Sequence, residues 1–451
     1  MNSKITFYSG AEEVTGANFL LDTGTTRLLV DCGTREEHGA DASTQEPFAY
    51  DPRSVDVLLV THAHQDHIGR IPKLVRDGFR GSIYSTPATR DIAAIMFNDA
   101  LSLMQVKMEE TGEHPAYESR DVEESLSLWQ THEYHEPFDI ADMRVEMLDS
   151  GHILGAAMMR ISRAGRSILF TGDIGNTPEP LLSDTETPSG VQYLVMESVY
   201  GDRIHEGRED RKKHLREVIE DTRQRNGILL IPSFSIERTQ ILLSEINDMV
   251  EREHLTPLPV YLDAPLATRV TEVFKRYTGL FNEAAREKIT AGDDLFAFKG
   301  LTVIDTTRES RALHEAPDPK IIIAGAGMSS GGRIRAHEKA YLGRKDATVL
   351  MVGYQAPGSL GRRLEDGAKS VRIDDEWVRV HARIEALTGY SGHADRDQLM
   401  DFIENAGESL ERAFIVMGEP KSSLFLAQRA KDFLNADTYV PVRGETVTVE
   451  L

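Results

Sequence analysis

A histidine-rich stretch that directly follows an apolar run constrains this chain more than any other feature. Residues 57–60, Val-Leu-Leu-Val, read as a short buried strand because the run is unbroken and partly β-branched. The next segment, 61–67, reads Thr-His-Ala-His-Gln-Asp-His. A loop leaving the strand can turn its first two histidines to one metal ion and the following aspartate and histidine to a second. The predicted ligands are His62, His64, Asp66 and His67.

Two further segments carry candidate ligands downstream. Glycines surround His152, which lets the backbone approach closely, and Asp173 follows an apolar strand and a glycine. Imidazole and carboxylate together are a donor set that zinc prefers, and two such ions can clamp both oxygens of a displacement at phosphorus. A surface loop that is merely rich in histidine is disfavoured, because it would not explain these later ligands.

The ligand stretch resembles the signature of the metallo-β-lactamase fold. This resemblance implies an αβ/βα sandwich with its metal site on one edge. It also implies that His152 is the third histidine of the first metal site, that Asp173 bridges the two metals, and that Asp31, at the end of an earlier strand, orients the ligand loop by hydrogen bonds.

Two more segments resemble signatures of the β-CASP branch, which comprises nucleic-acid-processing nucleases with a nucleotide-binding domain inserted into this fold. Glu197 follows the strand-like run 194–196, and His393 lies in the glycine-containing segment 388–395. The resemblance implies that these two side chains lie close together, where the carboxylate would raise the histidine pKa and fix its tautomer. We therefore predict Asp66, Glu197 and His393 as the catalytic residues.

The inserted domain is expected to be a parallel α/β unit, because strand-like and helical segments alternate after residue 200. The expected bounds are 1–199 and 373–451 for the two parts of the metallo-β-lactamase domain and 200–372 for the β-CASP domain. Three strand-to-helix loops could bind phosphate, although glycine-rich turns of this kind are common for structural reasons alone. The predicted substrate-binding residues are Arg238, Ser329, Ser330, Gly331, Arg333 and Arg363.

One position departs from the family pattern. Met417 stands where the RNA-processing members usually carry a histidine that completes the second metal site, and a thioether is a poor zinc ligand. The second site is then weaker and filled by Zn²⁺ or Mn²⁺, or a nearby histidine substitutes, or activity is reduced. DNA-processing relatives also lack this histidine, so its loss does not by itself imply an inactive protein.

Composition limits the partners and the compartment. The net charge of −22 is unusual for a nucleic-acid-binding protein, so RNA would require a local basic cleft. The single cysteine excludes an intrachain disulfide and a cysteine-based zinc site. No apolar run approaches the roughly 20 residues that span a bilayer. These features predict a cytoplasmic protein that does not enter a membrane, and they leave a homodimer open.

The leading functional hypothesis is a zinc-dependent ribonuclease that hydrolyses phosphodiester bonds of single-stranded RNA, in RNA processing or decay, with internal cleavage expected. A metal-bridged hydroxide held by Asp66 and Asp173 would attack phosphorus in line, and Glu197 and His393 would assist the leaving group. A DNA nuclease of the same fold and a catalytically weak RNA-binding protein are the alternatives. A small-ester or thioester hydrolase would leave the inserted domain without a role.

Overall fold

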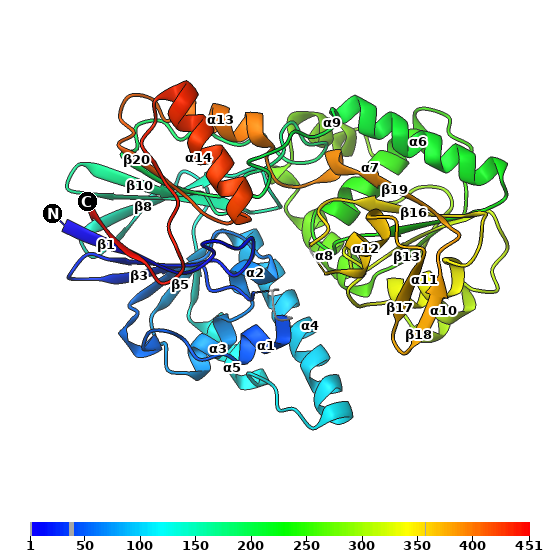
Figure 1. The fold of residues 1–451 in the computed structure, drawn as a ribbon, viewed down its shortest axis with the longest axis horizontal. Coiled ribbons are helices and arrows are strands. Elements are labelled where there is room, and N and C mark those ends of the chain that lie inside the picture. Colours follow the sequence, from blue (N-terminus) through cyan, green and yellow to red (C-terminus); the bar gives the residue numbers. More distant parts are fainter. Residues whose placement is uncertain (1, 36–39, 357) are drawn as a thin grey trace. The chain divides into compact units, whose positions relative to one another are not determined.

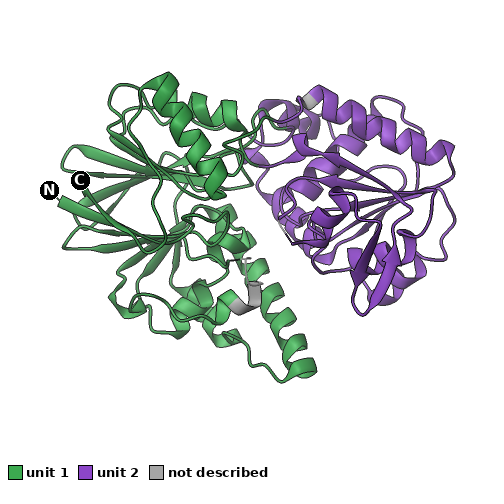
Figure 2. Cartoon of the chain, viewed as in Figure 1, with its two compact units in different colours: residues 1–179, 183–204, 393–451 green, residues 180–182, 205–392 purple. Residues whose placement is uncertain are grey.

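The computed structural model describes residues 2–35, 40–356 and 358–451, and these form two compact units (Figures 1 and 2). None of the helices in these ranges is long and apolar enough to cross a membrane. The first unit comprises Met1–Glu179, Ser183–Ile204 and His393–Leu451, and the second comprises Pro180–Leu182 and His205–Gly392.

The first unit is built on two sheets, each with seven strands in the described part of the chain. The first sheet has the order β22-β1-β2-β3-β4-β5-β6, and the second has the order β21-β20-β11-β10-β9-β8-β7. The strands of the first sheet are β1 (Asn2–Ser9), β2 (Asn18–Asp22), β3 (Arg27–Val30), β4 (Val57–Leu59), β5 (Ser82–Ser85), β6 (Trp129–Thr131) and β22 (Thr446–Glu450). The strands of the second sheet are β7 (Phe138–Ile140), β8 (Met143–Asp149), β9 (Ala157–Arg163), β10 (Arg166–Phe170), β11 (Tyr193–Met196), β20 (Arg412–Ile415) and β21 (Thr438–Tyr439).

The two sheets share one apolar core. Strand β1 alternates buried and outward positions, so Ile5 and Phe7 point inward, where they join Met159 and Phe170 of the second sheet in one buried cluster. Helices cover the outer faces, and Leu399 of α13, for example, packs with residues of β11 and α14. The helices of this unit are α1 (Ala40–Gln45), the short 3₁₀ helix η1 (Pro52–Ser54), α2 (Gln65–Ile68), α3 (Ile71–Arg76), α4 (Pro87–Thr111), α5 (Ser119–Ser127), α13 (Arg396–Asn405) and α14 (Pro420–Leu434), and a second 3₁₀ helix, η3 (Thr388–Tyr390), lies in the second unit.

The second unit contains a six-stranded sheet, in the described residues, with the order β14-β13-β15-β12-β16-β19. All of its strand pairs are parallel, and β12, β15 and β16 are buried along their whole length, as expected for a sheet covered by helices on both faces. A separate antiparallel hairpin joins β17 to β18. The strands are β12 (Ile228–Pro232), β13 (Val260–Asp263), β14 (Leu301–Val303), β15 (Lys320–Ala324), β16 (Ala347–Val352), β17 (Ser370–Ile373), β18 (Glu376–Arg379) and β19 (Arg383–Leu387). The helices are α6 (Arg208–Gln224), α7 (Arg238–Glu251), α8 (Pro265–Arg276), η2 (Thr278–Leu280), α9 (Glu283–Thr290), α10 (Thr307–Ala312), α11 (Ile334–Tyr341) and α12 (Leu360–Glu365).

The chain returns to the first unit later than the sequence predicts. The expected return was residue 373, but packing keeps the chain in the second unit as far as Gly392. The reason is that β19 pairs in parallel with β16, from Thr348 opposite Arg383 to Val352 opposite Leu387. The compact units are defined by packing alone, so the bounds of 200 and 372 for the inserted domain remain predictions.

Candidate metal centre

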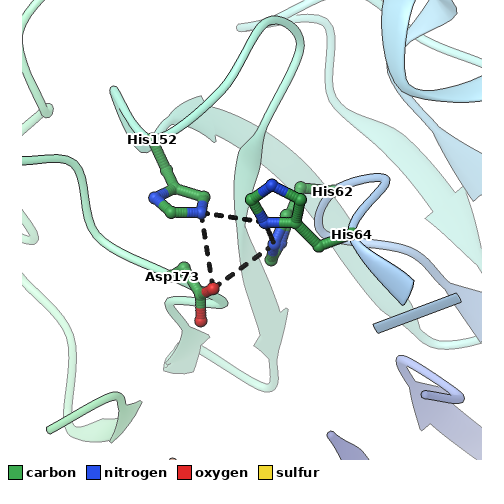
Figure 3. A group of neighbouring side chains, drawn as sticks. All are labelled: His62, His64, His152 and Asp173. Carbon is green, nitrogen blue, oxygen red and sulfur yellow. Dashed lines mark hydrogen bonds and ion pairs between the residues drawn. The ribbon is translucent and has the colours of Figure 1, made fainter. Parts of the chain in front are cut away.

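Four side chains from three separate segments meet at one edge of the first unit (Figure 3). His62 and His64 follow β4, His152 lies in the loop between β8 and β9, and Asp173 follows β10. His64 Nδ1 lies 3.1 Å from His62 Nε2 and 3.2 Å from His152 Nε2. Asp173 Oδ2 lies 3.4 Å from the Nε2 atoms of both His62 and His152.

These separations fit a tetrahedral zinc ion. Four ligand atoms at about 2.0–2.1 Å from zinc, at the corners of a tetrahedron, are separated from one another by about 3.3 Å. Burial lowers the pKa values of His62 and His64 well below the usual range, so both rings are neutral and each has a lone pair for a cation.

A glycine allows the ligand segments to approach each other. Gly172 has a φ of +54°, and a Cβ atom at this position would lie 2.6 Å from Thr61 Oγ1. Any larger residue would therefore push the end of β10 away from the ligand loop and move Asp173 out of the cluster.

A second cluster lies beside the first and shares Asp173 with it. His67 Nε2 lies 3.3 Å from Asp173 Oδ1 and 3.8 Å from Asp66 Oδ2. His67 Nε2 and Asp173 Oδ1 are buried, and neither has a hydrogen-bond partner among the described residues. Leaving buried polar atoms unsatisfied costs free energy that a bound cation would recover. The three side chains therefore fit a second divalent ion.

The segment that carries Asp66 and His67 is helical, whereas a loop is expected from the sequence. Residues Gln65–Ile68 form the single turn of α2, in which the amides of His67 and Ile68 donate to the carbonyl of His64. A single turn is short enough that Asp66 and His67 still face the same cluster.

Asp31 holds the ligand loop through three hydrogen bonds. Its Oδ1 accepts from the amide of Thr61 at 2.8 Å, and its Oδ2 accepts from Thr61 Oγ1 at 2.7 Å and from His67 Nδ1 at 2.7 Å. The proton on His67 Nδ1 leaves Nε2 as the ring atom that faces Asp66 and Asp173. The sequence analysis did not single out Thr61, whose only signal is its position immediately before the ligand loop.

Glu197 and His393 form a pair next to these clusters. Glu197 follows β11 and is fully buried, and its carboxylate accepts from the amides of Ile174 at 2.8 Å and Val199 at 3.2 Å. His393 Nδ1 lies 3.1 Å from Glu197 Oε1 and 3.8 Å from Asp173 Oδ2. Burial opposes a charged ring, but the carboxylates of Glu197 and Asp173 outweigh burial and raise the pKa of His393 to about 9. The two carboxylates therefore favour the cationic form of the His393 ring.

The pKa values of two carboxylates of the site are shifted in opposite directions. Burial raises the pKa of Asp66 to about 6, because the nearby His67 offsets desolvation only in part. Burial would also raise the pKa of Asp173, but the surrounding histidines, His67 first among them, hold it well below the usual range. Asp173 is thus the permanent negative charge at the centre of the site.

Met417 packs into the core of the first unit. Its side chain is 2% exposed, and a Cβ atom on Gly10 would lie 2.7 Å from its Sδ atom. Its amide donates to the carbonyl of Gly10 at 2.7 Å. Within the described ranges, no further histidine joins the cluster of Asp66, His67 and Asp173. The substitution of a nearby histidine, one of the three outcomes expected from the sequence, therefore has no candidate there.

The predicted substrate-binding residues all lie in the second unit, in different surroundings. Ser329 is buried and donates to the carboxylate of Glu338, and Arg333 donates to Asp263 at 2.5 Å and to the carbonyl of Asp305 at 2.8 Å. These two side chains therefore hold the structure of their own loop. Arg238 is 6% exposed and Gly331 is half-buried, whereas Ser330 and Arg363 are exposed.

The same unit holds a buried polar network that no sequence motif predicts. Asp263 Oδ2 lies 2.7 Å from His337 Nε2, and His337 Nδ1 lies 3.2 Å from His314 Nε2. Ser310 Oγ also donates to Asp263, at 2.5 Å. Each hydrogen bond of the network joins residues on different elements, so no local sequence motif predicts the network.

A buried cluster of three histidines and an aspartate, at the edge of an αβ/βα sandwich, defines a metal-dependent hydrolase of the metallo-β-lactamase fold. Residues 12–217 match the metallo-beta-lactamase superfamily, residues 239–364 match the Beta-Casp domain, and residues 377–441 match the Zn-dependent metallo-hydrolase RNA specificity domain. The chain belongs to the β-CASP family of this superfamily, which confirms the resemblance and the fold class predicted from the sequence.

Relatives support the same assignment. The chain is 36% identical over 425 residues to "Ribonuclease TTHA0252" of Thermus thermophilus, a match that covers 94% of this chain and 95% of that protein. It is 30% identical over 462 residues to "Transcription termination factor FttA" of Methanosarcina mazei, covering 98% of this chain and 71% of the relative. A crystal structure of a protein of unknown function from Enterococcus faecalis aligns over both whole chains with a TM-score of 0.57 at 13% identity, which reports the fold alone.

Proposed function

We propose that this chain is a metal-dependent ribonuclease that hydrolyses phosphodiester bonds within single-stranded RNA. The observation that carries the proposal is the tetrahedral cluster of His62, His64, His152 and Asp173, with the Glu197–His393 pair beside it. The match to an RNA specificity domain and the relative named a ribonuclease favour RNA as the substrate.

The chain's own residues would divide the reaction between them. Divalent ions, when bound, would supply Lewis acidity and lower the pKa of the attacking water. Asp66 and Asp173 would orient that water on the side of phosphorus opposite the leaving group. Glu197 would keep the Nδ1 proton of His393, so that the Nε2 proton of the same ring is available to the leaving oxygen.

We propose Zn²⁺ for the first site, because two imidazole Nε2 atoms, one Nδ1 atom and a carboxylate at these separations are a zinc donor set. The second site, with three protein ligands, would bind Zn²⁺ or Mn²⁺ more weakly. The cytoplasm remains the proposed compartment, since a single buried cysteine suits reducing conditions. A homodimer stays a hypothesis that sedimentation would test.

The direct test is His64→Ala in the full chain. Residues that merely orient a metal ligand typically cost about 10- to 100-fold when they are changed. Because His64 is itself a proposed ligand, we expect this change to lower cleavage of single-stranded RNA by more than about 100-fold. The melting temperature should stay near the wild-type value with metal added. His114→Ala, which alters an exposed histidine, is the matched control and should cleave normally. Full activity of the His64→Ala variant would refute the proposal.

Cleavage of a 5′-labelled and a 3′-labelled RNA by the wild-type protein tests the mode of cutting. Internal products from both labels are expected, whereas release of single nucleotides from one end would contradict internal cleavage.

Met417 keeps one alternative open, a DNA nuclease, because DNA-processing relatives also lack the histidine at this position. Turnover of RNA and single-stranded DNA of one sequence separates the two substrates. RNA should be cut faster, and preference for DNA would replace the proposed substrate.

A further inference from the structure

One hairpin of the second unit carries a tryptophan between arginines on its outer face. In the hairpin of β17 and β18, Arg372 lies opposite Trp377, and Ser370 lies opposite Arg379. Directly opposed residues of an antiparallel pair, and residues two apart on one strand, share a face. Val371, which points to the other face, is buried in the core of the unit. We call the outer set, Ser370, Arg372, Trp377 and Arg379, the tryptophan face.

Trp377 is unusually accessible. Its side chain is 73% exposed, which is more than any other large hydrophobic side chain in the described part of the chain. The chain contains two tryptophans, and the other, Trp129, is 6% exposed and donates from Nε1 to Ser85 Oγ at 2.8 Å. A large aromatic ring that remains in water is more often found where a partner will cover it.

Most charged groups near this ring are already paired, and two nearby cations are not paired in the described part of the chain. Each acidic residue of the hairpin turn already has a cationic partner. In contrast, Arg379 and the neighbouring Lys369 are exposed, and neither forms an ion pair within the described part of the chain. The amide of Val380 donates to the carbonyl of Lys369 at 3.0 Å, so Lys369 stands one position before Ser370, opposite Val380, and does not belong to the tryptophan face. The paired groups are Arg335–Asp374 at 2.9 Å, Arg372–Asp375 at 2.9 Å and Lys339–Glu376 at 2.7 Å.

We propose that the tryptophan face binds single-stranded RNA, with a base stacked on Trp377 and with Arg379 contacting a phosphate. The inference rests on the proposed function, because it takes the ribonuclease substrate as the ligand. RNA satisfies both features of this face, since it brings flat aromatic bases and negative charge together. An apolar protein surface would cover the ring but would leave Arg379 without a partner.

Stacking makes a specific demand on the nucleic acid. Every base offers a π face, so the contact should tolerate any sequence, but the base must be unpaired for the ring to reach it. A duplex of the same length carries more phosphates and hides its base faces. Comparing the two therefore separates stacking on Trp377 from simple attraction to charge.

Tryptophan fluorescence reports this contact directly. The full chain with Asp66→Asn, which should not consume the RNA, is titrated with single-stranded oligouridylate. We expect the emission to be quenched, and we expect the quenching to disappear in the further variant Trp377→Phe, where buried Trp129 is the remaining emitter. Equal quenching by a duplex, or quenching that persists in Trp377→Phe, would overturn the inference.

Affinity provides the second readout. Trp377→Ala should weaken binding of single-stranded RNA by about 5- to 160-fold, the range for losing one stacked base, whereas Trp377→Phe keeps a ring and should lose less. Arg379→Gln should reduce the salt dependence of binding by about 0.7 in the slope of log K against log salt, as for one phosphate contact with a single strand. Leu103→Ala, which removes a side chain that is 65% exposed on α4, is the control and should bind normally.

Parallel cleavage by the wild-type protein distinguishes the two proposals. Cleavage of RNA without a response of Trp377 would overturn this inference and leave the ribonuclease intact. Absence of cleavage with metal supplied would overturn the proposed function, whether or not the fluorescence responds. If Trp377→Ala changes the sedimentation of the protein but not its affinity for RNA, the face is a contact between copies of the chain, and the inference fails.

Discussion

Asp31 connects the scaffold to the metal centre through a single carboxylate. It is 1% exposed, and it accepts hydrogen bonds from both the backbone and the side chain of Thr61 as well as from His67. Asn at this position keeps the size of the side chain but can no longer accept through both terminal atoms. The orientation of His67 then depends on one fewer strong contact.

We predict that Asp31→Asn lowers RNA cleavage by about 10- to 100-fold, as is typical for outer partners of metal ligands. Metal analysis should find the first site filled and the second site depleted, because Asp31 contacts His67 and does not contact His62, His64 or His152 in any described hydrogen bond. Asp22→Asn, at the end of β2, is the control. Unchanged metal content and turnover would mean that the loop keeps its geometry without this carboxylate.

The individual candidate ligands could be predicted from the sequence, because they follow predicted strands or glycines in the order that the family signatures have. His62, His64, His152 and Asp173 do meet in one cluster, and His393 does lie beside Glu197. The sequence did not predict the surroundings of the Met417 side chain. Its packing against Gly10 depends on how two distant segments approach, which no spacing within either segment encodes.

At the scale of elements, the Asp263 network joins the end of β13 to helices α10 and α11. Asp263 and His337 are both fully buried, and Arg333, at the start of α11, is held by the same carboxylate. Burial raises the pKa of Asp263, but hydrogen bonds from His337, Ser310 and Arg333 outweigh it and lower that pKa overall. The carboxylate is therefore charged in the folded protein and is balanced by these donors.

We expect Asp263→Ala to destabilise the second unit by about 3–5 kcal/mol, because it leaves buried cationic and polar groups without their partner. Denaturant unfolding measures this loss. Metal content per chain should remain at the wild-type value, since the ligands belong to the first unit. Loss of metal at unchanged stability would show that the network acts on the metal centre instead.

Local pattern predicted most elements, but it did not predict where their pairings end. The apolar run 57–60 corresponds to β4, and the alternation after residue 200 corresponds to the parallel sheet of the second unit. The compact second unit extends to Gly392 because β19 pairs with β16, and β19 is half exposed and polar at several positions, so its sequence does not read as a strand of a buried parallel sheet.

At the scale of the whole molecule, the two metal clusters differ in the number of ligands that the chain provides. The first has four ligands, and the second has Asp66 and His67 in addition to the shared Asp173. Binding strength follows ligand number and type, so the two ions should leave at different chelator concentrations.

We therefore predict two separated steps of metal loss when the purified chain is dialysed against increasing chelator, with elemental analysis after each step. Activity should fall with the first step and return when Zn²⁺ or Mn²⁺ is restored. Loss of both ions in a single step would mean that Met417 does not weaken the second site.

The order of segments along the chain has a consequence for biosynthesis. All four ligands of the first site precede the second unit, whereas His393, β20 and β22 follow it. At translation rates of about 5–20 residues per second, the nascent polypeptide would display the ligands of the proposed first metal site for on the order of ten seconds or more before His393 emerges. A ribosome-bound chain would thus hold the first set of ligands before His393, the proposed proton donor, has been made, so cleavage that needs His393 would begin only after the second unit has been synthesised.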